Sequence, residues 1–172
     1  MVKTLTSINQ KTQIAYLAMG CFWGPQLLFD KTPGVASTRV GYMGGNQRSF
    51  PHLTYVQVCT HLTNYAETVE VVYDPKKISY SKLLDIFFEN HDLTQKNRQH
   101  FDIGNQYRSA IFYIDEKQKK EIENSIKSRQ KSYQSKIVTK ISSAKKSKFF
   151  EAEEYHQKYL SKKGITAPTC HT

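Results

Sequence analysis

Three short segments contain residue types that can do chemistry, and the first is GCFWG at residues 20–24. Its cysteine, Cys21, lies between a strand predicted over Thr12–Met19 and a helix predicted over Phe22–Lys31. Backbone N–H groups and the positive end of the helix dipole meet at such a point, and both stabilise a thiolate. The flanking glycines let a ligand approach the backbone closely. The pattern is compatible with a reactive thiol and equally with a cysteine buried among core aromatics.

The second segment is the strand predicted over Glu67–Tyr73, ETVEVVY. Side chains alternate along a strand, so Glu67 shares one face with Val69, Val71 and Tyr73. A carboxyl on an apolar face either lies at the strand end in solvent or is half buried. In the half-buried case the neutral acid is favoured, and the group can donate a proton near neutral pH.

The third segment, DIGNQYRS at residues 102–109, precedes the strand predicted over Arg108–Ile114. Tyr107 could present its hydroxyl at a site while its ring packs, and Asp102 could orient a polar group. Ordinary capping within a loop explains the same residues.

The elements that must position these segments alternate irregularly between strand and helix. Further strands are predicted over Val35–Tyr42 and Ile137–Ser142, and a short extended piece over Tyr55–Cys59. Helices are predicted over Tyr80–Asn90, Glu116–Tyr133 and Phe149–Leu160, with loops at 43–54 and 91–106 and an irregular tail at 161–172. We therefore expect an α+β fold in one domain, residues 1–172, as a two-layer sandwich with a mixed sheet, flanking helices and a ferredoxin-like core.

Composition excludes several classes of protein. The 172 residues are 38% hydrophobic with a mean hydropathy of −0.60, and no apolar run is long enough to cross a bilayer. The N-terminus has no apolar run of signal-peptide length, and three cysteines are too few for a disulfide scaffold. We expect a cytoplasmic protein, without a membrane or a specific nucleic-acid partner, that is a monomer.

The net charge of +10 is concentrated in residues 116–163, which hold 14 Lys and Arg against 6 Asp and Glu. No arginine–aromatic interleaving, zinc spacing or helix-turn-helix pattern accompanies this charge, so a solvated lysine-rich face is favoured over a nucleic-acid site. The six histidines have no metal-ligand spacing with cysteine, and no metal site is expected. His156 is expected to be structural.

Together the three segments resemble the peptide methionine sulfoxide reductase A family. GCFWG matches the active-site signature of that family, and LLFDKTPGV, VGYMGG, TYVQVCT, AETVEVVYDP, GNQYRSAIFY and AEEYHQKYL follow in the same order. The resemblance covers roughly residues 14–160. It departs from the family at Asn64-Tyr65, where Gly-His is usual, and at His52-Leu53, where Asn-Pro is common.

The resemblance implies an enzyme that reduces methionine-S-sulfoxide, free or in proteins, to methionine. It makes Cys21 the nucleophile and Glu67 the acid, with Tyr55 and Tyr107 binding the sulfoxide oxygen. Asp102 would help to position the substrate, and Phe22 with Trp23 would form the wall around its S-methyl group. No cofactor is implied beyond an external dithiol such as thioredoxin.

The sulfenic acid left on the nucleophile would condense with a second thiol. Cys59 lies in a strand-like stretch where a cysteine is often only a small buried residue, so Cys170 in the tail is the preferred resolving cysteine. Two alternatives remain at this point: a thiol peroxidase, which needs no such acid, and a basic binding module acting through residues 116–163.

Overall fold

The computed structural model describes residues 12–50 and 52–168. Six strands form a mixed sheet in the order β7-β6-β1-β3-β2-β8, in which only the β6–β7 pair is parallel. The strands are β1 (Gln13–Met19), β2 (Val35–Met43), β3 (Ala66–Tyr73), β6 (Ser109–Tyr113), β7 (Lys140–Ser143) and β8 (Phe150–Glu151). A small hairpin, β4 (Arg98–Gln99) with β5 (Asp102–Ile103), lies outside this sheet.

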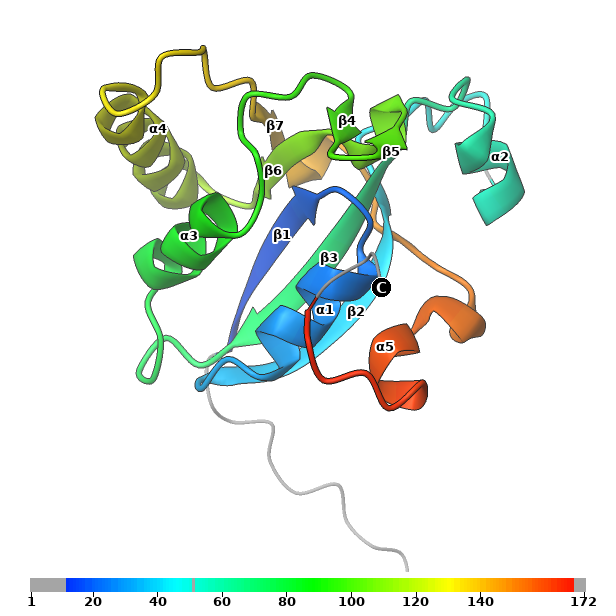
Figure 1. Cartoon of the computed structure of the whole chain (residues 1–172), viewed down its shortest axis with the longest axis horizontal. Helices are drawn as coiled ribbons and strands as arrows, with labels where there is room; N and C mark the ends of the chain where they lie inside the picture. Colours follow the sequence, from blue (N-terminus) through cyan, green and yellow to red (C-terminus); the bar gives the residue numbers. More distant parts are fainter. Residues whose placement is uncertain (1–11, 51, 169–172) are drawn as a thin grey trace, which may run out of the picture.

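Helices cover one face of the sheet (Figure 1). Helix α1 (Trp23–Asp30) packs on β2 and β3, α3 (Tyr80–Glu89) on β1, and α4 (Glu116–Gln130) on β6. The two short helices, α2 (Tyr55–Cys59) and α5 (Tyr159–Lys162), lie toward the right of the same view. The expected α+β class with a mixed sheet and flanking helices is confirmed.

Alternation of side chains along the central strands separates two hydrophobic clusters. On the helix-covered face Ala15, Leu17 and Met19 of β1 join the large cluster, whereas Ala18 points into the smaller cluster on the other face. Strand β3 is buried on both faces, since it lies between β1 and β2. Val69, Val71 and Tyr73 belong to the large cluster, so the face of β3 that Glu67 shares with them is the helix-covered face.

Three sequence-based predictions of secondary structure were wrong. The piece predicted as extended over Tyr55–Cys59 is helix α2, begun by a capping box in which Thr54 Oγ1 accepts from Gln57 N and Thr54 N donates to Gln57 Oε1. The helix predicted over Phe149–Leu160 is instead β8, a 3₁₀ turn at Glu154–His156 and α5. The loop predicted over 91–106 contains the β4–β5 hairpin.

Candidate active site

The turn that carries Cys21 is fixed by the sheet on one side and by the hairpin on the other. Gly20 has a φ of +91°, and a Cβ there would lie 2.8 Å from the side chain of Gln99. Gln99 donates to Asp92 O and accepts from Asp92 N, so the hairpin is itself anchored. A glycine at position 20 thus allows both the left-handed turn and the close approach of the hairpin.

Helix α1 begins immediately after the cysteine, with Phe22 as its N-cap residue. Cys21 therefore lies beside the first backbone N–H groups of the helix, as the sequence predicted. One of them, Phe22 N, donates to Glu67 Oε2 at 3.1 Å. This hydrogen bond joins the cysteine turn to β3 across 45 residues of sequence.

Glu67 is buried, with 1% of its surface exposed, and the solvent-exposed alternative is therefore wrong. Register explains its position: Leu17 of β1 pairs with Val69, and Tyr42 of β2 pairs with Glu67. The carboxyl thus lies where β1 ends and the cysteine turn begins. A buried carboxyl has lost much of the water that stabilises its charge, which favours its protonated form.

The structure brings together all seven described residues that the sequence nominated. They line one pocket of about 240 Å³, together with His156: Cys21, Phe22, Trp23, Tyr55, Glu67, Asp102 and Tyr107. Asp102 enters from the hairpin, where it pairs with Gln99, and Tyr107 from the 3₁₀ turn Asn105–Tyr107. The eighth nominated residue, Cys170, lies outside the described residues.

Both pocket tyrosines keep their protons at neutral pH. Burial raises the pKa of Tyr55, and a hydrogen bond with Cys59 and the nearby Tyr107 and Glu67 raise it further. Burial is also the main cause of the raised pKa of Tyr107, and the neighbouring carboxyl groups of Glu67 and Asp102, which are charged at the high pH where a phenol ionises, raise it further. Two phenolic hydroxyls that remain protonated can donate hydrogen bonds to an oxygen held in the pocket.

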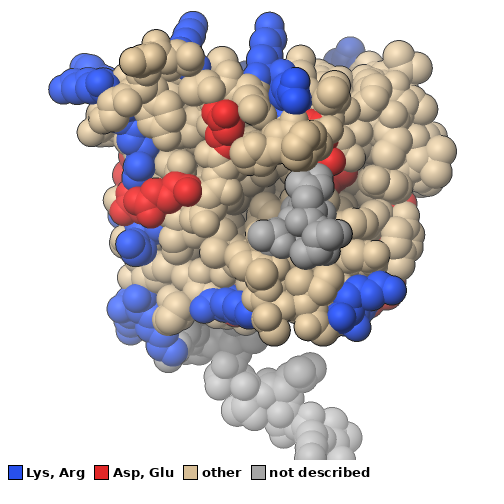
Figure 2. All heavy atoms as spheres, in the orientation of Figure 1, with Lys and Arg blue, Asp and Glu red and all other residues tan. Residues whose placement is uncertain are grey.

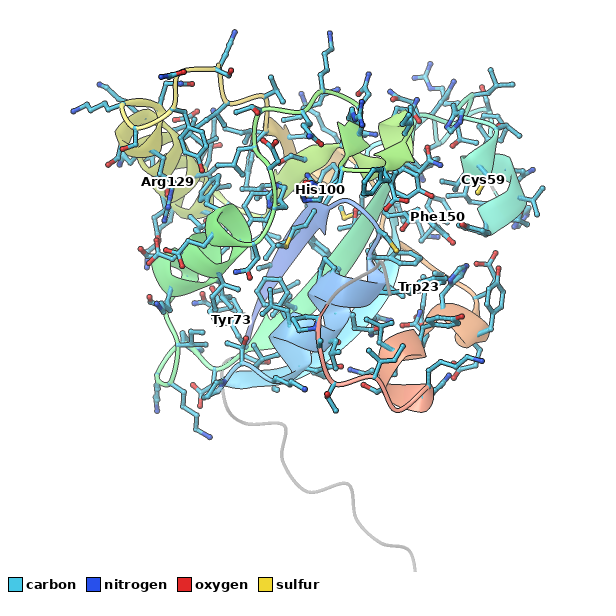
Figure 3. The ribbon with its side chains drawn as sticks, in the orientation of Figure 1. Trp23, Cys59, Tyr73, His100, Arg129 and Phe150 are labelled. Atoms are coloured by element: carbon cyan, nitrogen blue, oxygen red, sulfur yellow. The ribbon has the colours of Figure 1, made fainter. Side chains whose placement is uncertain are left out.

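His156 belongs to the pocket wall, although the sequence indicated only a structural role. Trp23 Nε1 donates to His156 Nδ1 at 3.1 Å, which fixes the indole against the pocket. The imidazole ring packs edge-on against Phe22 and Tyr55, with centroids 5.2 and 4.6 Å apart. Burial lowers the pKa of His156, so the ring is neutral near pH 7 and its Nε2 carries the proton. Figure 3 shows Trp23 between α1 and the C-terminal segment.

Glu153 is a residue that sequence reasoning missed. Its Oε1 accepts from Tyr55 N at 2.8 Å, and its Oε2 accepts from the hydroxyl of Tyr42 at 3.1 Å. These hydrogen bonds help to lower the pKa of Glu153, against the opposing effect of burial, and keep it ionised. The carboxylate ties α2 to β2, and the Glu-Glu pair before Tyr155 in the sequence gives no indication of this.

Cys59 lies on α2, where Figure 3 labels it apart from Trp23. The sequence had predicted a short extended, strand-like stretch here, which is wrong. Its side chain instead hydrogen-bonds with Tyr55 and is half buried.

Within residues 12–50 and 52–168, no group of three or more His, Cys, Asp or Glu side chains could hold a metal ion. In the same residues no helix is long and apolar enough to span a membrane. On the face shown in Figure 2, Lys and Arg side chains are spread around the edge rather than gathered in one patch.

Comparison with known proteins supports the same chemistry. The family model for peptide methionine sulfoxide reductase matches residues 13–172. A peptide methionine sulfoxide reductase MsrA from Pelagibacter ubique is 48% identical over 151 residues, covering 88% of this chain and 99% of that protein. Reduced Mxr1 from Saccharomyces cerevisiae superposes with a TM-score of 0.84 at 35% identity, covering 95% of this chain and 92% of that one.

A second yeast structure shows Mxr1 in complex with Trx2. It matches with a TM-score of 0.59 at 25% identity and covers 92% of each chain. A cysteine at a helix start, a buried carboxyl and two protonated tyrosines around one pocket agree with these matches. The chain belongs to the peptide methionine sulfoxide reductase A family and is a methionine sulfoxide reductase.

Proposed function

We propose that this enzyme reduces the S epimer of methionine sulfoxide, free or within proteins, through a sulfenic acid on Cys21. The observation that carries the proposal is the shared pocket in which Cys21, at the start of α1, lies with the buried Glu67. A sulfoxide oxygen is a poor leaving group until it is protonated, so the reaction needs a nucleophile and an acid at the same sulfur.

In the first step the thiolate of Cys21 attacks the sulfoxide sulfur while Glu67 donates a proton to the sulfoxide oxygen. The helix start stabilises the thiolate, and burial keeps a proton on the acid. The hydroxyls of Tyr55 and Tyr107 donate hydrogen bonds to the oxygen as negative charge develops on it. The products are methionine and the sulfenic acid of Cys21.

The remaining pocket residues select and orient the substrate. Phe22 and Trp23 form an apolar wall for the S-methyl group, and the hydrogen bond from Trp23 to His156 holds that wall in place. Asp102 lines the pocket from the hairpin and orients the polar part of the substrate. The two epimers differ in where the methyl group and the oxygen lie when the sulfur faces Cys21. With a fixed wall for the methyl group and a fixed site for the oxygen, only one epimer fits.

Recycling follows by disulfide chemistry. Cys170 condenses with the sulfenic acid of Cys21, and thioredoxin reduces the resulting disulfide. The complex of yeast Mxr1 with Trx2 supports a thioredoxin as the reductant. The thiols supply the electrons, so the cycle needs no metal or organic cofactor.

We propose that the chain acts as a single-domain monomer in the reducing cytoplasm.

The test uses a methionine sulfoxide peptide and a dithiol with three proteins: wild type, Cys21→Ser and Cys59→Ser. The serine at 21 is a far weaker nucleophile and should abolish reduction, whereas Cys59→Ser should remain active. With a racemic sulfoxide, wild type should consume about half of the substrate and stop, because one epimer does not fit. More than a few per cent of activity in folded Cys21→Ser, or complete consumption of both epimers, would contradict the proposal.

A further inference from the structure

A pocket of about 380 Å³ lies next to the active site without being part of it. Three of its lining side chains are basic, Lys96, Arg108 and Lys140, and the described residues that line it include no Asp or Glu. Arg108 directly follows Tyr107 of the active-site pocket, but the described linings of the two pockets share no residue. We call it the basic pocket.

Arg108 is the most buried of the three basic residues, with 7% of its surface exposed. Its guanidinium donates to the backbone carbonyls of Asn105 at 2.8 Å, Asn64 at 3.0 Å and Gly44 at 3.4 Å. Within residues 12–50 and 52–168 it forms no ion pair with a carboxylate, and its Nε has no hydrogen-bond partner. The three carbonyls hold the guanidinium in place but carry no net charge to balance it.

A buried cation without a counter-ion is unfavourable, because it has lost much of its hydration. Burial lowers the pKa of Arg108 to about 10, so the side chain still carries its charge at neutral pH. Two less buried arginines do have carboxylate partners: Arg39 lies 2.8 Å from Glu70, and Arg129 lies 2.6 Å from Asp85. An anion in the basic pocket would balance the charge that the described part of the chain leaves unpaired.

The two lysines belong to segments that are fixed around Arg108. Lys140 is the first residue of β7, which pairs in parallel with β6 directly after Arg108. Val138 N donates to Leu93 O at 2.8 Å, which joins the approach to β7 to the segment that leads to Lys96. Three positive charges from three separate segments of the chain therefore line one pocket.

These side chains suit a ligand with two negative charges and several acceptor oxygens. Lysine ammonium groups bind phosphate oxygens as point charges, and a guanidinium does so with directed N–H groups. The side-chain amides of Asn64 and Asn97, which also line the pocket, can donate further hydrogen bonds. A carboxylate offers only one charge and two oxygens, and a metal cation would be repelled.

We propose that the basic pocket binds a phosphate group, as the free ion or as a monoester. The phosphate oxygens accept from the lysines at the mouth of the pocket, and their negative charge balances the buried guanidinium. This site is separate from the sulfoxide pocket and does not depend on the proposed function.

The experiment titrates the wild-type chain with inorganic phosphate at constant ionic strength, with sodium chloride as the balancing salt. Backbone amide signals of Lys96, Ser109 and Lys140 are followed by ¹⁵N NMR and should shift saturably. Amides of α4 should not shift saturably, since attraction to net charge alone is matched by chloride. Acetate, with a single charge, should bind at least about fivefold more weakly than phosphate. O-Phosphoserine is titrated in the same way as the monoester.

Two lysine variants test the site directly. Both lysines are exposed, so Lys96→Gln and Lys140→Gln should each raise the Kd for phosphate about two- to fivefold, and together at least about fivefold. Lys140→Arg retains the charge and should stay within about twofold of wild type. The matched control is the double variant Lys117→Gln/Lys120→Gln, which removes the same charge from exposed positions on α4 outside the basic pocket and should also stay within about twofold. Arg108 is left unchanged, because its loss would free three backbone carbonyls.

The absence of a saturable shift with phosphate would overturn the proposal. Equal weakening in the α4 control would overturn it as well, because net charge alone would then explain the binding. The same holds if acetate binds as tightly as phosphate. Binding of O-phosphoserine at the same amides would support a monoester as the ligand, and binding of inorganic phosphate alone would support the free ion.

Discussion

Two of the segments that line the active-site pocket, the Cys21 turn and the C-terminal segment at residues 152–157, are held in place by different means. The Cys21 turn lies between regular elements, β1 and α1, and its register with β3 is fixed by the central sheet. The segment at residues 152–157 contains only a 3₁₀ turn and is held by long-range bonds. Gln157, for example, exchanges two hydrogen bonds with the backbone of Val40 across 117 residues. The candidate reactive groups Cys21 and Glu67 thus lie at regular elements of the central sheet. The C-terminal segment, which has little regular structure, supplies the residues packed around them.

This contrast predicts that substitutions on the regular side remove chemistry, whereas those in the C-terminal segment disturb geometry or stability. After the loss of activity expected for Cys21→Ser, the largest effect should come from Glu67→Gln, which keeps the shape of the side chain and loses the proton. The single-turnover rate should fall roughly 10²- to 10⁴-fold, the usual contribution of general acid catalysis. Glu70→Gln is the control, because Glu70 is also buried on β3 but faces the other way and pairs with Arg39. A rate within threefold of wild type in Glu67→Gln would show that another group donates the proton.

On the regular side, acid should destabilise the fold through His91, whose Nε2 lies 2.7 Å from Ser109 Oγ of β6. Burial lowers the pKa of His91 to about 4, against the opposing effect of its bond to Phe87 O. The unfolded chain binds this proton near pH 6.5, so the stabilisation is present above that pH and is lost as the pH falls toward 4. Over this range the contribution of His91 to the free energy of unfolding falls by about 3 kcal/mol. Urea unfolding gives the free energy of unfolding at pH 7.5 and at pH 4.5. The difference between these two values should be smaller for His91→Gln than for wild type. It should be the same as in wild type for His52→Gln, because His52 is exposed.

Gln157→Ala tests how firmly the C-terminal segment is held. The Gln157 side chain accepts from Val40 N and donates to Val40 O and Ala152 O, and all three contacts are buried. Their loss should lower the free energy of unfolding by about 1–3 kcal/mol. Gln130→Ala also removes two hydrogen bonds to the backbone, but at the more exposed C-terminal end of α4, and should lower the free energy of unfolding less. Equal losses in the two variants would show that the segment is not specially dependent on Gln157.

The smallest expected effect is on geometry alone. Glu153→Ala removes the acceptor of Tyr55 N and of the Tyr42 hydroxyl, so α2 can shift relative to the pocket. Displacement of one oxygen-binding hydroxyl should reduce kcat about tenfold. Glu153→Gln retains an acceptor and should recover most of the rate. Glu154→Ala, which loses only a contact with Lys162, should match wild type. No recovery in Glu153→Gln would indicate that the charge, and not the hydrogen bonds, matters.

Local sequence patterns were sufficient to predict most of the regular framework and to nominate the candidate reactive groups. Alternating apolar residues in ETVEVVY fixed β3 and the face of Glu67, and the Gly-Cys junction fixed the position of Cys21 at the start of α1. The helix predicted from Tyr80 does begin there, as α3, and Ser79 caps it by accepting from Lys82 N. These features follow from local rules, because strand alternation and helix capping involve residues close in sequence.

How the pocket is closed depends on contacts between residues that are far apart in the sequence. A helical reading of residues 149–160 failed because backbone pairing of β8 with β2 and the bonds of Gln157 outweigh local helix preference. The capping box at Thr54 could have revealed α2, but a five-residue helix gives too little periodicity for detection. The contacts of Glu153 with Tyr55 and of His156 with Trp23 join residues 98 and 133 positions apart. Such contacts depend on the completed fold, because no local pattern encodes which distant backbone amide or indole a side chain will meet.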